Sequence, residues 1–137
     1  MRTTVIDTGP LVAAFDSRDQ YHNLTSRIFT DITMPLITCE AVVVETCFLL
    51  SKFPDALQRF GNWLHMARIQ VPFRISDESR HVFSLMKKYE DMPMSLADAC
   101  LVVMVELNPE LGVFTFDKHF QIYRTASRRV IKTVGLD

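Results

Sequence analysis

Short apolar runs alternate with longer segments of helical periodicity along the whole chain. The runs of strand length cover residues 3–6, 35–39, 69–72, 112–116 and 129–134. Helical patterns predict helices over residues 10–16, 21–32, 40–51, 54–67, 76–89 and 95–107. Strands separated by helices indicate βαβ units, so we expect an α/β fold whose mainly parallel sheet of about four to five strands carries helices on both faces.

Length and composition favour one folded domain. The chain has 137 residues, of which 48% are hydrophobic and 23% charged, so we expect a single domain over residues 1–137. No apolar run reaches the ~20 residues of a membrane-spanning helix, and no secretory signal precedes the first strand. The three cysteines are odd in number and lie in apolar segments, which favours buried, reduced thiols in a cytoplasmic protein without a membrane partner.

Charge is balanced overall but uneven along the chain. The net charge is -1, which gives no global signal for nucleic acid. An acid-free stretch near the C-terminus nevertheless carries five cations: Lys118, Arg124, Arg128, Arg129 and Lys132. Such a strip can follow a phosphate backbone, although a solvated surface helix and strand explain it equally well.

Four carboxylates occupy positions where isolated charges are costly. Asp7 and Asp117 each follow a predicted strand, and the carboxyl ends of parallel strands share one edge of a sheet. Glu45 and Asp98 lie inside nearly all-apolar helices, where we expect little contact with water. Acids gathered together would take up protons unless a cation neutralised them. A hard divalent ion, Mg²⁺ or Mn²⁺, meets that requirement with oxygen ligands.

Each acid also has a purely structural interpretation. Asp7 could cap the helix that starts near Pro10, and Asp117 could begin a turn. Glu45 could share a solvated stripe with Lys52, and Asp98 could form a capping box with Ser95. It is the joint occurrence of the four, two at strand ends and two in buried helices, that favours a common site.

The tripeptide Asp7-Thr8-Gly9 raises two further hypotheses, and the sequence around it disfavours both. An aspartic protease needs β structure after this tripeptide and a second aspartate that shares the proton, but Pro10 starts a helical pattern and no second such tripeptide exists. A phosphatase that forms an aspartyl phosphate would need an acid two residues after Asp7, and that position is Gly9.

Four segments spread over the chain resemble the PIN domain family in the form of its VapC-like toxins. They are "VIDTGPLVAAFDSRDQYH", "LITCEAVVVETCFLL", "YEDMPMSLADACLVVMV" and "VFTFDKHF". The resemblance implies a three-layer PIN-like fold and a metal-dependent ribonuclease whose catalytic and metal-binding acids are Asp7, Glu45, Asp98 and Asp117. In this reading Asp7, Asp98 and either Glu45 or Asp117 hold one or two ions.

The resemblance also assigns roles to neighbouring residues and partners. Thr8 and Ser95 match the polar residues beside the first and third acids, and we expect them to orient carboxylates or water at the substrate site. RNA would approach along Lys118, Arg124, Arg128 and Arg129. We further expect an antitoxin partner and a homodimer. A catalytically silent scaffold, and a PIN-fold nuclease acting on DNA or in RNA processing, are the alternatives.

Overall fold

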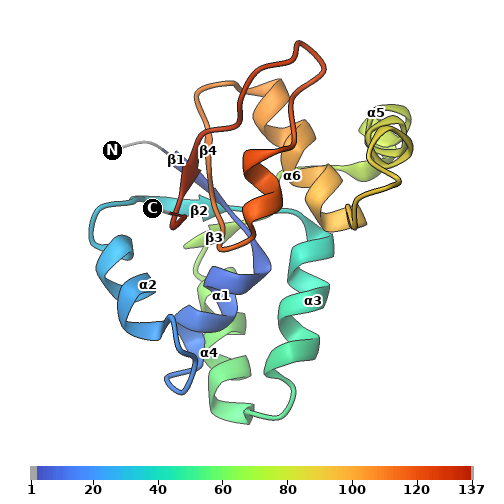
Figure 1. Ribbon diagram of the computed structural model, residues 1–137. Helices are drawn as coiled ribbons and strands as arrows, with labels where there is room; N and C mark the ends of the chain where they lie inside the picture. The colour runs from blue at the N-terminus through green and yellow to red at the C-terminus, as the bar shows by residue number, and fades with distance from the viewer. Residues whose placement is uncertain (1–2, 137) are drawn as a thin grey trace.

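The computed structural model describes residues 3–136, and within that range it confirms the α/β prediction (Figure 1). The strands are β1 (Thr3–Ile6), β2 (Thr33–Ile37), β3 (Ile69–Gln70), β4 (Gly112–Phe114) and β5 (Thr133–Val134). They form one sheet in the order β3-β2-β1-β4-β5, and every neighbouring pair is parallel. Because β1 is the central strand, its carboxyl end lies in the middle of the sheet edge where ligands bind in parallel sheets.

Helices cover both faces of this sheet. They are α1 (Thr8–Phe15), α2 (His22–Phe29), α3 (Glu40–Leu50), α4 (Pro54–His65), α5 (Ile75–Lys88), α6 (Leu96–Leu107) and the short 3₁₀ helix η1 (Lys118–Gln121). In Figure 1, α5 and α6 lie on one side, whereas α1, α2 and α4 lie on the other. The first turn of α6 and the start of α1 therefore approach the same end of β1 and β4.

Helix α6 is the apolar centre of the molecule. Every residue from 97 to 105 is buried, and the helix contacts β1, β4, α3 and α5. Asp98 is the one charged residue within that buried stretch. None of the helices in the described range is long and apolar enough to cross a membrane.

Several element boundaries differ from those predicted. Strand β2 begins and ends two residues before its predicted limits. Its pairing with β1 runs from Thr3 opposite Thr33 to Val5 opposite Ile37, and Cys39 is already the N-cap residue of α3. The predicted last strand is reduced to β5. Arg128 adopts a positive φ of 63° in a turn that is closed by an antiparallel bridge between Arg124 and Val130.

The packing of α6 predicts a sharp difference between two of its leucines. Leu101 is fully buried, so Leu101→Ala should lower the free energy of unfolding by about 2–5 kcal/mol. Leu107 is 59% exposed on the last turn, so Leu107→Ala should change it by less than about 0.5 kcal/mol. Urea unfolding of both variants checks this, and equal losses would contradict the packing described.

Candidate active site

The first acid is fixed by the end of the β1–β4 pair. The Asp7 N–H donates to the carbonyl oxygen of Phe114 (2.9 Å), which extends the pairing by one bond. One carboxylate oxygen of Asp7 accepts from the Thr8 N–H (2.8 Å), and the other accepts from the Thr115 hydroxyl (2.8 Å). Asp7 is therefore the N-cap residue of α1 and a strand-end acid at the same time, so its structural and functional interpretations coexist.

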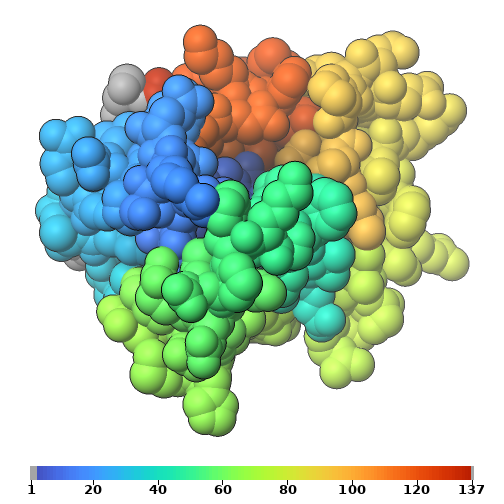
Figure 2. All heavy atoms as spheres, turned by 90° about the horizontal axis from the view of Figure 1, so that it is seen from below, coloured from blue at the N-terminus to red at the C-terminus, as the bar shows by residue number. Residues whose placement is uncertain are grey.

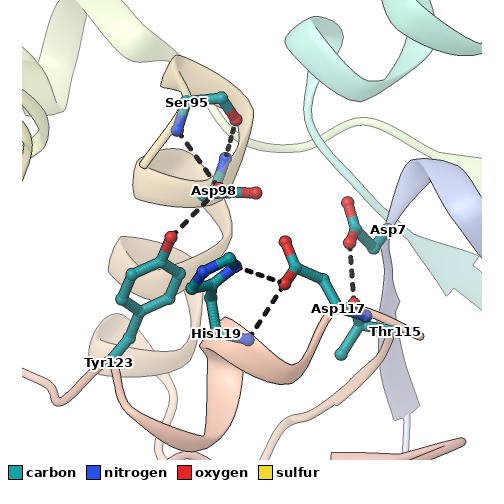
Figure 3. A network of polar contacts seen from close by, with 7 residues as sticks. All are labelled: Asp7, Ser95, Asp98, Thr115, Asp117, His119 and Tyr123. Atoms are coloured by element: carbon teal, nitrogen blue, oxygen red, sulfur yellow. Dashed lines mark hydrogen bonds and ion pairs between the residues drawn. The ribbon is translucent and has the colours of Figure 1, made fainter. Parts of the chain in front are cut away.

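Asp117 reaches the same place through the chain that leaves β4. Its N–H donates to the Thr115 hydroxyl (3.0 Å), so Thr115 joins Asp7 and Asp117. Oδ1 of Asp117 accepts from the His119 N–H (2.9 Å) and lies 2.7 Å from the ring Nδ1 of His119. These contacts occupy one carboxylate oxygen, and the other is turned toward Asp7 and Asp98 (Figure 3).

Asp98 is held in the first turn of α6 by the capping box that the sequence suggests. The Asp98 N–H donates to the Ser95 hydroxyl (3.0 Å), and the Ser95 N–H donates to Oδ2 of Asp98 (3.1 Å). The hydroxyl of the fully buried Tyr123 donates to the same oxygen (3.2 Å). Because both donors use Oδ2, Oδ1 is left to face the other acids (Figure 3).

Glu45 joins the site from α3, but not as the buried acid that its sequence neighbours predict. It lies on an exposed face of α3, and Oε1 accepts from the Thr8 hydroxyl (2.7 Å). The expectation of little contact with water was wrong, because this apolar helix exposes Val44, Phe48 and Leu49 alongside Glu45. Thr8 links α1 to α3 through this bond.

The four acids line one cleft of about 680 Å³. Thr8 and Ser95 line it with them, and the remaining walls are apolar: Val44, Phe48, Leu49 and Pro93. Seen from below in Figure 2, the dark-blue N-terminal segment forms the floor of a hollow between the teal-green α3 and the orange chain that follows β4. Residues 110 positions apart in sequence thus share one cavity.

Burial makes ionisation of these acids costly. Asp7 and Asp98 are each only 8% exposed. Burial raises the pKa of Asp7 from 3.8 to about 6, against hydrogen bonds from Thr115 and Thr8 and with help from the charges of Asp98 and Asp117. Burial, together with the charge of Asp117, also raises the pKa of Asp98.

The donor set fits a hard divalent cation. Among the described residues, no three acidic, histidine or cysteine side chains already stand close enough to hold a metal ion. The carboxylates instead face one another across the cleft, and each aspartate is oriented by fixed donors. A small ion that keeps several of its waters suits such an open arrangement, and its charge would offset the raised pKa values.

The residues of the predicted cationic strip do not line this cleft. None of Lys118, Arg124, Arg128 and Arg129 is among the described residues that line it. Nη1 of Arg124 donates to three backbone carbonyls, those of residues 121, 122 and 123. The turn that carries Arg128 and Arg129 contacts α6 through Glu106, whose carboxylate accepts a hydrogen bond from the Ala126 N–H. Glu106 lies at the end of α6 that is far from Asp98. A role for these four in substrate binding stays a prediction.

Sequence reasoning missed three residues that organise the site: Thr115, His119 and Tyr123. Thr115 and Asp117 are two residues apart after a strand, a spacing that places side chains on the same side, so Thr115 had a detectable signal. His119 contacts Asp117 through its ring Nδ1, two residues further along the chain. Tyr123 gave no local signal, because its contact with Asp98 spans 25 residues.

The PIN domain family model matches residues 4–126. This chain belongs to the PIN domain family. The match spans all four acids of the cleft and includes Tyr123. Curated proteins offer no relative, since none of them matches the sequence.

Among solved structures, the PIN fold of this chain is similar to VapC20 of Mycobacterium tuberculosis, described as a toxin that cleaves the sarcin-ricin loop. The two superpose with a TM-score of 0.75 at 16% sequence identity. The match covers 85% of this chain and 91% of VapC20. At this identity the likeness establishes a common fold.

The raised pKa of Asp7 predicts how stability depends on pH in the metal-free protein. Because Asp7 keeps its proton to about pH 6 when folded but only to 3.8 when unfolded, stability falls as pH rises through this interval. The fall amounts to about 3 kcal/mol, at 1.36 kcal/mol for each of roughly two pKa units. Urea unfolding from pH 4 to 7 in EDTA measures it.

The matched variants for this test are Asp7→Asn and Asp77→Asn. Asp7→Asn should flatten most of the slope, and the raised pKa of Asp98 should leave a smaller fall of the same sign. Asp77 is exposed in the first turn of α5, so its replacement should preserve the wild-type slope. If Asp7→Asn kept the full slope, desolvation of Asp7 would not be its source.

Two adjacent tyrosines allow a test of how Asp98 is oriented. Tyr123 and Tyr89 pack edge to face with centroids 5.1 Å apart, and both hydroxyls are hydrogen-bonded, but only that of Tyr123 reaches an acid. Tyr123→Phe should weaken Mn²⁺ binding by roughly 10-fold, as loss of a partner of a metal ligand does. Tyr89→Phe should leave the affinity unchanged at a similar cost in stability. Calorimetric titration with Mn²⁺ measures both, and equal affinities would refute the orienting role.

Proposed function

We propose that this protein is a metal-dependent endoribonuclease that hydrolyses RNA phosphodiester bonds, with residues 1–137 acting as one PIN domain. The observation that carries the proposal is the convergence of Asp7, Glu45, Asp98 and Asp117 on one cleft. A PIN-family fold with four carboxylates in a common cavity, two of them with raised pKa values, is suited to phosphodiester hydrolysis assisted by a divalent ion.

In this proposal the acids divide between binding and positioning. Asp7, Asp98 and either Asp117 or Glu45 would hold Mg²⁺ or Mn²⁺. Such an ion lowers the pKa of water and neutralises charge that develops on the phosphate oxygens. Thr115 sets the orientation of Asp7, whereas Ser95 and Tyr123 set that of Asp98. Thr8 keeps Glu45 turned toward the cleft, because its hydroxyl donates to Oε1.

The toxin role is the finer part of the proposal. It is supported by the similarity to VapC20, whose description as a toxin that cleaves the sarcin-ricin loop names an RNA target. We propose that this chain likewise acts on RNA and pairs with an antitoxin in the cytoplasm, as a homodimer. Exposed apolar side chains outside the cleft, such as Ile122 and Val130, provide surface for such partners.

Asp98→Asn should abolish RNA cleavage and leave the fold intact. Asparagine keeps an oxygen to accept the capping bond but loses the charge that a cation needs. Because even partners of metal ligands contribute up to about 100-fold, loss of a ligand should reduce the rate by at least that much. Asp77→Asn, the same exchange in the first turn of α5, should cleave normally.

The assay should compare single-stranded RNA, structured RNA and single-stranded DNA, each with Mg²⁺, with Mn²⁺ and with EDTA. We expect cleavage of RNA that needs the ion. A protein that cut only DNA would refute the RNA assignment, and one that cut nothing would favour a silent scaffold. Cleavage by Asp98→Asn at the wild-type rate would show that the site is elsewhere.

A further inference from the structure

The wall of the cleft formed by α3 differs in chemistry from the acids that face it. Val44, Phe48 and Leu49 line the cleft and are 68%, 77% and 49% exposed. Spacings of four and five residues place them on one face of α3, beside Glu45. A phenylalanine that leaves three quarters of its surface in water contributes little to the stability of the fold. Packing in the core therefore does not explain why a phenylalanine stands at this position.

The cleft also lacks the groups that usually bind a nucleic-acid backbone. None of the described residues that line it is a lysine, an arginine or a histidine, whereas four are carboxylates. Phosphates that flank the scissile bond are therefore repelled by the walls, and a bound ion can compensate at one position only. Contacts with the neighbouring nucleotides must then come from uncharged groups, and the apolar face of α3 offers them.

A nucleobase matches this face in size and chemistry. Exposed aromatic rings bind single-stranded nucleic acid by stacking on the π-faces of bases. Within the cleft the apolar strip is short, because α3 contributes Val44, Phe48 and Leu49 beside Glu45 and then ends at Leu50. Three side chains are far fewer than the roughly 20–30 residues that each partner contributes to a stable protein interface.

We propose that Phe48 is the stacking platform for a base next to the cleaved phosphate, and that the substrate is accordingly single-stranded at that point. This inference rests on the proposed nuclease function and assigns its substrate subsite. The ring holds the base, the carboxylates hold the ion, and the phosphate between them is placed over the acids. Base-paired RNA does not present a free base face to this wall, so it is excluded until the strand opens.

The test is a comparison of Phe48→Ala with Phe83→Ala on single-stranded RNA. Phe83 is also an exposed phenylalanine (57%), but it lies on α5 and outside the cleft. Stacking contributes equally before and during cleavage, so Phe48→Ala should raise KM with little change in kcat. The rise should be about fivefold or more, which corresponds to the lower bound for one stacked base. Phe83→Ala should match the wild type, and Phe48→Tyr should retain the wild-type KM.

A substrate with abasic nucleotides beside the cleaved bond completes the design. Wild type and Phe48→Ala should show the same KM on it, since the stacking partner is gone from both complexes. If wild type cleaves RNA but Phe48→Ala keeps the wild-type KM on the intact substrate, the platform is refuted while the nuclease stands, and the face then belongs to a protein partner. If wild type cleaves nothing, the nuclease proposal fails. Fluorescence anisotropy with labelled RNA then decides the platform separately, and equal affinities of both proteins would refute it.

Discussion

The parallel pairing of β1 and β4 is the constraint on which the site depends. It ends at Ile6 opposite Phe114, so the next residues of the two strands, Asp7 and Thr115, emerge at the same level. The hydroxyl of Thr115 then connects Asp7 to the backbone of Asp117, two residues further along. A shift of one residue in this pairing would turn Thr115 to the other face of the sheet and separate the two acids.

Burial and charge oppose one another at this edge. The same apolar strands and the same buried α6 that make the fold stable also desolvate Asp7 and Asp98 and raise both pKa values. The N-termini of helices reduce the cost of ionising these acids, because a helix N-terminus favours negative charge. Asp7 caps α1, Asp98 lies in the first turn of α6 and Asp117 caps η1. The folded chain therefore holds partly neutralised acids in place, and in the proposed mechanism a cation balances the remainder of their charge.

The parts of this arrangement that local pattern encodes were predictable, and the parts that tertiary contacts create were not. Strand ends located Asp7, and the capping sequence located Asp98. Periodicity could not tell which side of α3 faces water, because that helix is apolar all round, and Glu45 was therefore wrongly expected to be buried. The bond between Thr115 and Asp7 joins residues 108 apart, a relation that no local window contains.

The double duty of the aspartates has a consequence for proteins of this shape. Asparagine caps a helix about as well as aspartate, so an exchange of one oxygen for one nitrogen keeps the architecture and removes the negative charge that the proposed metal site needs. By such substitutions a chain of this kind can lose catalytic activity while it keeps its fold and its stability. The fold alone therefore says little about whether such a protein cleaves nucleic acid. In the proposed mechanism, the side-chain atoms at positions 7, 98 and 117 carry that information.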